Sequence, residues 1–197
     1  EIKLSDNEII KIGIIGVGAK MEKTGKEAIT TAGWEGFGFK DIKGTIEKEV
    51  EEIKGYYPDL NAVIGAIHAG MNCQNPRKLG IYTKDQSSKL CQGELYDILS
   101  STESGLLDAV ISGDKSYIVH DWINNIPVIS TIDGGQYTNI MYLPFKKVDG
   151  KYKLIKDQVK IESPLPNCEE IFNNTKICDG VESSDEYETE GPLVKFK

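Results

Sequence analysis

Three segments of this chain place polar side chains directly after apolar runs. They read "GVGAK" at 16–20, "HAGMNC" at 68–73 and "SGDKS" at 112–116. If the preceding runs are strands of one parallel sheet, all three segments open at the same sheet edge, where α/β proteins usually place their chemistry. The residues there whose side chains could do chemistry are His68, Asp114 and Ser116.

Each of these residues also has an ordinary structural interpretation. A lone histidine after a buried strand is either a polar site residue or a satisfied core residue, and both stay open for His68. Asp114 and Ser116 could equally cap and solvate a turn. The pair Gly16 and Gly18 lacks the third glycine of a dinucleotide-binding loop, because Met21 stands there, so a tight turn is favoured.

The elements that must position these segments alternate between strand and helix in the first half of the chain. The apolar runs favour buried strands, and apolar residues at helical spacing favour amphipathic helices. This order predicts βαβ crossovers and a parallel sheet, followed by consecutive antiparallel strands with a hairpin at Asp149-Gly150. The fold class is therefore α/β. The expected elements are strand 9–17, a helix within 39–60, strand 62–67, helix 87–102, strand 106–113, and strands within 126–133 and 137–163.

Composition excludes some classes of partner. The chain has 197 residues and a formal net charge of −8, with no basic cluster, which argues against nucleic acid and anionic membrane surfaces. No apolar run approaches the roughly 18 residues that span a bilayer. The length suits one domain or a large part of one, and the start at Glu1 instead of Met suggests a processed or partial chain.

The cysteines indicate an oxidising compartment. They fall into two close pairs, which predicts disulfides Cys73–Cys91 and Cys168–Cys178, and Asn173 begins an N-x-T glycosylation sequon. Together they favour an extracytoplasmic protein, secreted, periplasmic or at the cell surface. The alternative is four free buried thiols and a chance sequon.

Six short pieces, taken in order, resemble the calcineurin-like metallophosphoesterase domain of the 5′-nucleotidase family. The resemblance covers about residues 3–163. It implies a layered sheet with flanking helices whose first strands are missing from this chain, a partial domain at 1–163 and an acidic, cysteine-containing tail at 164–197. The pieces are "KIGIIG" (11–16), "FKD" (39–41), "HAG" (68–70), "LLDAVISGD" (106–114), "VHDWINNIPVIS" (119–130) and "GGQYTNIMYLPF" (134–145).

The resemblance also implies a centre of two divalent metals, Zn²⁺ or Mn²⁺, in which a bridging hydroxide attacks phosphorus. His68 matches a metal-binding histidine of the family. Asp114 and Ser116 stand where two further histidines are expected, Lys115 adds unfavourable positive charge, and His120 falls in a family loop. Asp114 could still ligate through oxygen, whereas Ser116 is a poor substitute, and no catalytic residue is assigned.

Three functions remain open at this point. The first is a catalytically degenerate member that acts as a structural or assembly protein. The second is an active nucleotide phosphoesterase completed by an upstream segment or a second chain. The third is a secreted α/β binding module for which the resemblance is misleading. All three predict that another chain or the missing segment covers an open edge of the sheet.

Overall fold

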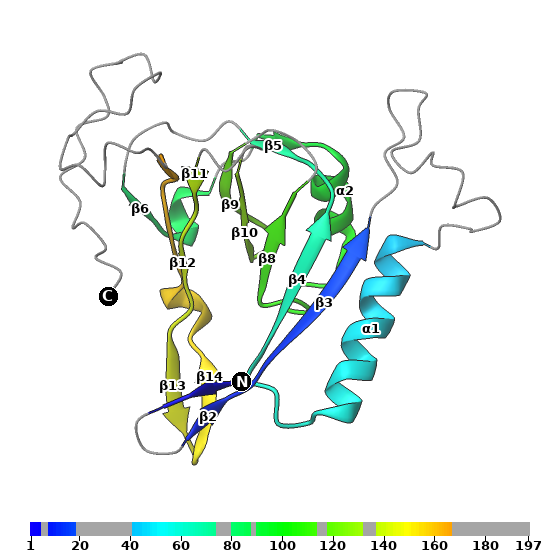
Figure 1. The fold of residues 1–197 in the computed structure, drawn as a ribbon. Helices are drawn as coiled ribbons and strands as arrows, with labels where there is room; N and C mark the ends of the chain where they lie inside the picture. Colours follow the sequence, from blue (N-terminus) through cyan, green and yellow to red (C-terminus); the bar gives the residue numbers. More distant parts are fainter. Residues whose placement is uncertain are drawn as a thin grey trace.

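The computed structural model describes residues 1–4, 8–18, 41–73, 80–87, 90–113, 118–131 and 137–166. Its centre is a five-stranded sheet in the order β3-β4-β8-β10-β9 (Figure 1). The first four strands of this order are parallel to one another, and β9 is antiparallel to β10. The predicted α/β fold is therefore confirmed. The five strands are β3 (Ile12–Gly18), β4 (Ala62–His68), β8 (Ala109–Ser112), β9 (Val119–Ile123) and β10 (Ile126–Ser130).

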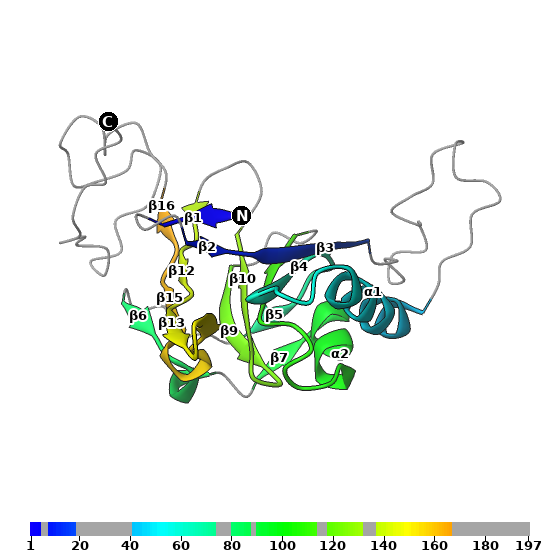
Figure 2. The same cartoon turned by 90° about the horizontal axis from the view of Figure 1, so that it is seen from below.

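Two helices cover one face of this sheet (Figure 2). Helix α1 (Ile42–Tyr56) connects β3 to β4, and α2 (Glu94–Ser101) lies between β4 and β8. Both crossovers step across the sheet in the same direction, and crossovers of one handedness then place both helices on the same side. We call this side the helix face.

Helix α1 follows the periodicity that its sequence predicted. Ile46 and Val50 are fully buried, and Ile53 is partly buried against the sheet. The Asp41 carboxylate accepts a hydrogen bond from the Gly44 N–H at 2.6 Å, which satisfies one of the free donors of the first turn.

The predicted helix 87–102 is wrong in its first half. The helix begins only at Glu94, after the short strand β7 (Cys91–Gln92), and Leu90 is 62% exposed. Gly93 has a φ of 125°, which breaks the helical backbone. Cys91 pairs instead with Cys73 of β5 (Asn72–Cys73) in an antiparallel ladder.

The strands after β8 differ in part from the prediction. The segment 119–123, which the family resemblance placed in a loop, is strand β9. It pairs with β10 through a tight turn in which Asn124 and Asn125 both have positive φ, a conformation that asparagine tolerates well. The predicted Asp149-Gly150 turn is confirmed between β13 (Phe145–Val148) and β14 (Lys151–Leu154).

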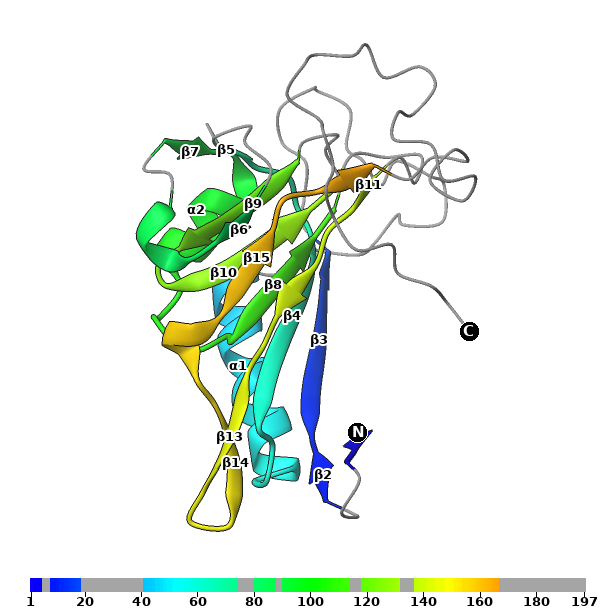
Figure 3. The same ribbon diagram turned by 90° about the vertical axis from the view of Figure 1, so that its left-hand side faces the viewer.

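A second, smaller layer covers part of the other face of the large sheet. Its three-stranded sheet has the order β12-β15-β6, and β12 and β15 are drawn in front of the large sheet in Figure 3. Its apolar side chains pack against Trp122 of β9 and Ile129 of β10. These strands are β6 (Ile81–Tyr82), β12 (Met141–Tyr142) and β15 (Lys160–Glu162), with β11 (Tyr137–Thr138) and β16 (Leu165–Pro166) paired beside them and the 3₁₀ turns η1 (Lys84–Gln86) and η2 (Lys156–Gln158) between.

The N-terminal residues form a small two-stranded antiparallel sheet. Strand β1 (Ile2–Lys3) pairs antiparallel with β2 (Ile9–Ile10), which runs on through Lys11 into β3. Glu8 accepts hydrogen bonds from the Lys147 ammonium and the Tyr152 hydroxyl of the β13–β14 hairpin, and these bonds lower the pKa of the Glu8 carboxyl.

Candidate functional site

His68 lies where the sequence placed it, at the carboxyl end of β4 and exposed. It stands beside Gly18, its partner in the β3 ladder. Its Nδ1 lies 3.7 Å from the position that a Cβ on Gly113 would occupy, so the ring extends over the end of β8. The predicted edge therefore brings together the ends of β3, β4 and β8.

The described residues at this edge do not fit a centre of two metal ions. No cluster of three metal-ligating side chains within the described ranges contains His68. Asp114, Lys115 and Ser116 lie outside the described residues, so the predicted pair of ligands His68 and Asp114 stays a prediction.

His120 cannot share a metal ion with His68. It lies on β9, three strands away from β4 in the sheet, which corresponds to about 14 Å at the usual strand spacing. Its ring is buried, with its centroid 4.7 Å from that of the Tyr82 ring. Burial raises the pKa of the Tyr82 hydroxyl. His120 thus lies buried between the large sheet and the second layer and does not belong to the sheet edge.

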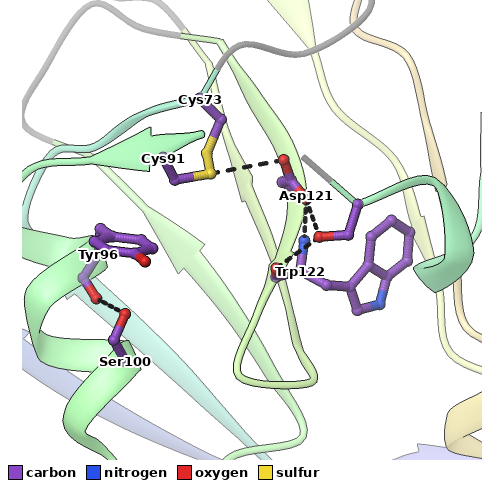
Figure 4. The surroundings of a disulfide bond; sticks show 7 residues. Cys73, Cys91, Tyr96, Ser100, Asp121 and Trp122 are labelled. Carbon is purple, nitrogen blue, oxygen red and sulfur yellow. Dashed lines mark hydrogen bonds between the residues drawn. A yellow bond between two sulfur atoms is a disulfide. The ribbon is translucent and has the colours of Figure 1, made fainter. Parts of the chain in front are cut away.

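A second group of chemically active side chains surrounds the pair Cys73 and Cys91. The two sulfurs form a disulfide with a Cα–Cα distance of 4.0 Å, in agreement with the predicted pairing. The Asp121 carboxylate, 1% exposed, lies 3.7 Å from the Cys91 sulfur (Figure 4). It accepts hydrogen bonds from the Ser87 hydroxyl and the Trp122 N–H, both at 2.7 Å.

Sequence reasoning missed Asp121, although an aspartate inside a fully buried strand is an unusual pattern. Cys73, Cys91 and Asp121 place their ligand atoms within 4.8 Å of one another. A metal ion would need thiolates here, and in the disulfide both sulfurs are bonded to each other. With the disulfide formed, the contact between Cys91 and Asp121 connects the β5–β7 ladder to β9. Cys168, Cys178 and Asn173 lie outside the described residues.

Part of the large sheet is not covered by the second layer among the residues that the structure describes. On β3, β4 and β8 the partly or fully exposed apolar side chains opposite the helix face include Ile14, Ile64, Ala66 and Ile111, whereas Ala62 and Ala109 on the same face are buried. They are neighbours in the ladder, because Ile14 pairs with Ile64 and Ala66 pairs with Ile111. Ile14 is 67% exposed and Ile111 is 51% exposed. We call this set of four residues the bare face.

The glycines of β3 show how different the two faces are. A Cβ on Gly13, on the helix face, would lie 2.9 Å from Ile53 Cδ1. Cβ atoms on Gly16 and Gly18, on the opposite face, would meet nothing within 4 Å. The helix face is therefore closely packed, whereas the bare face is open.

Comparison with known proteins gives structural likenesses but no sequence match. No family model matches the sequence, and no curated protein matches it. Fourteen chains of solved structures match. One is the calcineurin-like phosphoesterase YfkN from Bacillus subtilis, with 23% sequence identity and a TM-score of 0.42. The match covers 62% of this chain and 36% of that chain.

No helix in the described ranges is long and apolar enough to cross a membrane.

Proposed function

We propose that this chain is a 5′-nucleotidase-like metallophosphoesterase scaffold that has lost catalysis and acts as an assembly protein. The observation that carries the proposal is the bare face. Exposed isoleucines are ordinary when they are scattered, but a contiguous apolar patch on a sheet marks an interaction surface. Full burial of an isoleucine side chain contributes about 1.5–3 kcal/mol, so a partner that covers Ile14 and Ile111 would gain several kcal/mol.

The shortage of metal ligands supports the loss of catalysis. A two-metal phosphoesterase needs several histidine, aspartate or asparagine ligands at the strand ends. Among the described residues no group of three metal-ligating side chains contains His68, and the sequence has Asp114 and Ser116 where the resemblance expects histidines. The disulfide Cys73–Cys91 suits the extracytoplasmic location that we propose.

The proposal predicts that the protein binds no stoichiometric metal and hydrolyses no nucleotide. The protein is incubated with zinc or manganese, together with whatever chains co-purify, and unbound metal is removed. Mass spectrometry should then find no bound zinc or manganese. Hydrolysis of nucleoside monophosphates should not exceed that of a preparation of His68→Ala. About two metal ions per molecule, with hydrolysis that His68→Ala abolishes, would contradict the proposal.

That second outcome corresponds to the alternative function, an active phosphoesterase completed by an upstream segment or a second chain. The observation that favours it is the exposure of His68 at the same edge as the bare face. A segment docked on the bare face would lie beside this imidazole. The two functions therefore share a docking surface and differ in whether metal is present in the assembled state.

A single negative charge introduced on the bare face should disrupt binding of the partner. Ile111→Asp should release the partner, because docking would bury an unpaired carboxylate. The matched control is Ile81→Asp, since Ile81 is 54% exposed but lies on β6. Tagged protein purified from its native source is examined by sedimentation velocity. We expect wild type and Ile81→Asp to sediment as a complex and Ile111→Asp to sediment at the mass of the chain. A wild-type protein that sediments alone would refute the assembly role.

A further inference from the structure

The outer edge of β3 is open along its whole length in the described part of the chain. All seven residues of β3 pair with β4 on one side, and no described strand pairs with the other side. An edge strand offers unpaired N–H and C=O groups to an incoming strand. Proteins usually protect such an edge with a lysine, a proline or a bulge, and the sequence "IGIIGVG" contains no lysine or proline.

A groove runs beside this edge, between β3 and the exposed flank of α1. Its volume is about 300 Å³. Tyr56, on the last turn of α1, lines the groove and is 78% exposed. Its ring is therefore accessible to a ligand. The lining residues that matter here are Ile14 and Ile15 on β3 and Glu49, Glu52, Ile53 and Tyr56 on α1.

The charge of the groove has one sign. Glu49 and Glu52 line its rim, and no lysine or arginine is among the described residues that line it. Lys48 approaches Glu52 at 3.2 Å but does not line the groove. The groove thus combines an apolar wall, an acidic rim and the free hydrogen-bonding edge of a strand.

We propose that an extended segment of the partner protein adds to the β3 edge as a further strand. Its backbone would pair with β3, its apolar side chains on one side would enter the groove beside Ile53 and Tyr56, and a lysine or arginine would reach Glu49 and Glu52. Strand addition uses backbone pairing for affinity and alternate side chains for specificity. This inference rests on the proposed assembly function and names the class of partner.

A second copy of this chain is a poorer occupant of the groove. Its own β3 contains no basic residue that could meet Glu49 and Glu52. The net charge of −8 also repels a second copy. The expected partner segment is therefore basic, with alternating apolar side chains.

The test uses a peptide as long as β3, built of alternating valine and threonine with a central lysine. Its binding to the full chain is measured by fluorescence anisotropy. Glu49→Gln combined with Glu52→Gln should weaken binding about fivefold, as expected for two partly exposed ion pairs. Glu51→Gln is the matched control, because Glu51 lies on α1 but does not line the groove, and its effect should stay below about twofold.

Two further peptides separate strand addition from simple charge attraction. A peptide with N-methyl groups at alternate positions keeps the lysine but cannot pair as a strand, so it should not bind. A peptide with glutamate in place of lysine should bind more weakly. Equal binding of the N-methylated peptide, or equal binding to the double glutamine variant, would overturn the inference.

Hydrogen exchange identifies the position and the occupant. The lysine peptide should slow exchange of amides in β3. Protection of β3 that grows with protein concentration and needs no peptide would point to a second copy and overturn the inference. If Ile111→Asp still disrupts the native complex while the peptide fails, the edge proposal is wrong and the assembly function stands. If the native protein sediments alone, the assembly function itself fails.

Discussion

Leu99→Ala is expected to lower the free energy of unfolding by about 2–5 kcal/mol. Leu99 is completely buried on the inner side of α2. This helix has only eight residues, and its N-cap residue, Gly93, offers no side-chain cap. A helix that short is not stable by itself in water, so its packing on the sheet must hold it.

Urea unfolding of the purified chain measures this effect. The matched control is Leu90→Ala, which removes the same atoms from a side chain that is 62% exposed and should change stability by less than about 0.5 kcal/mol. Similar losses at Leu90 and Leu99 would mean that α2 does not pack on the sheet as described.

Removing the disulfide with Cys73→Ala and Cys91→Ala together is expected to cost about 3 kcal/mol. The bond closes a loop with a sequence separation of 18 residues, and the loop-entropy estimate for that length is about 3 kcal/mol. Alanine is chosen instead of serine because a serine hydroxyl at Cys73 would be buried in the apolar core between the helices and the large sheet. For a chain of this size the loss lowers the melting temperature by about 6–12 °C.

Reductant supplies the control for this prediction. Wild-type protein in reductant should melt near the temperature of the double variant, and a wild type that melts at the same temperature with and without reductant would contradict the disulfide. Any further effect of reductant on the double variant would report Cys168 and Cys178, and so would test the second predicted pair.

The parts of the fold that depend on neighbours along the chain could be predicted from the sequence. The period of Ile46 and Val50 predicted α1, the Asp149-Gly150 pair predicted its hairpin, and the separation of Cys73 and Cys91 predicted their bond. Each of these signals is local, because it involves residues within a few turns or one short loop. The start of α2 was missed because Cys91 is drawn into a ladder with β5.

The parts of the candidate site that depend on packing between distant segments could not be predicted. His120 became a core residue because β6 brings Tyr82 against it. The Asp121 carboxylate lies against the disulfide because β9 runs beside β5, and the Ser87 hydroxyl donates a hydrogen bond to this carboxylate. Nothing in the residues adjacent to either side chain indicates these contacts.

The sequence by itself indicated strands within 9–17 and at 62–67 and placed His68 at the end of the second, although the first prediction covers two strands, β2 and β3. It could not say which faces of these strands are covered. A run such as "IGIIGVG" is apolar at nearly every position, which is typical of a strand buried on both faces. Only the tertiary structure showed that the helices cover one face, while the second layer, in the described part of the chain, packs mainly on β10 and β9. Coverage of a face depends on where distant elements pack. That is why Ile14 and Ile111 remain exposed.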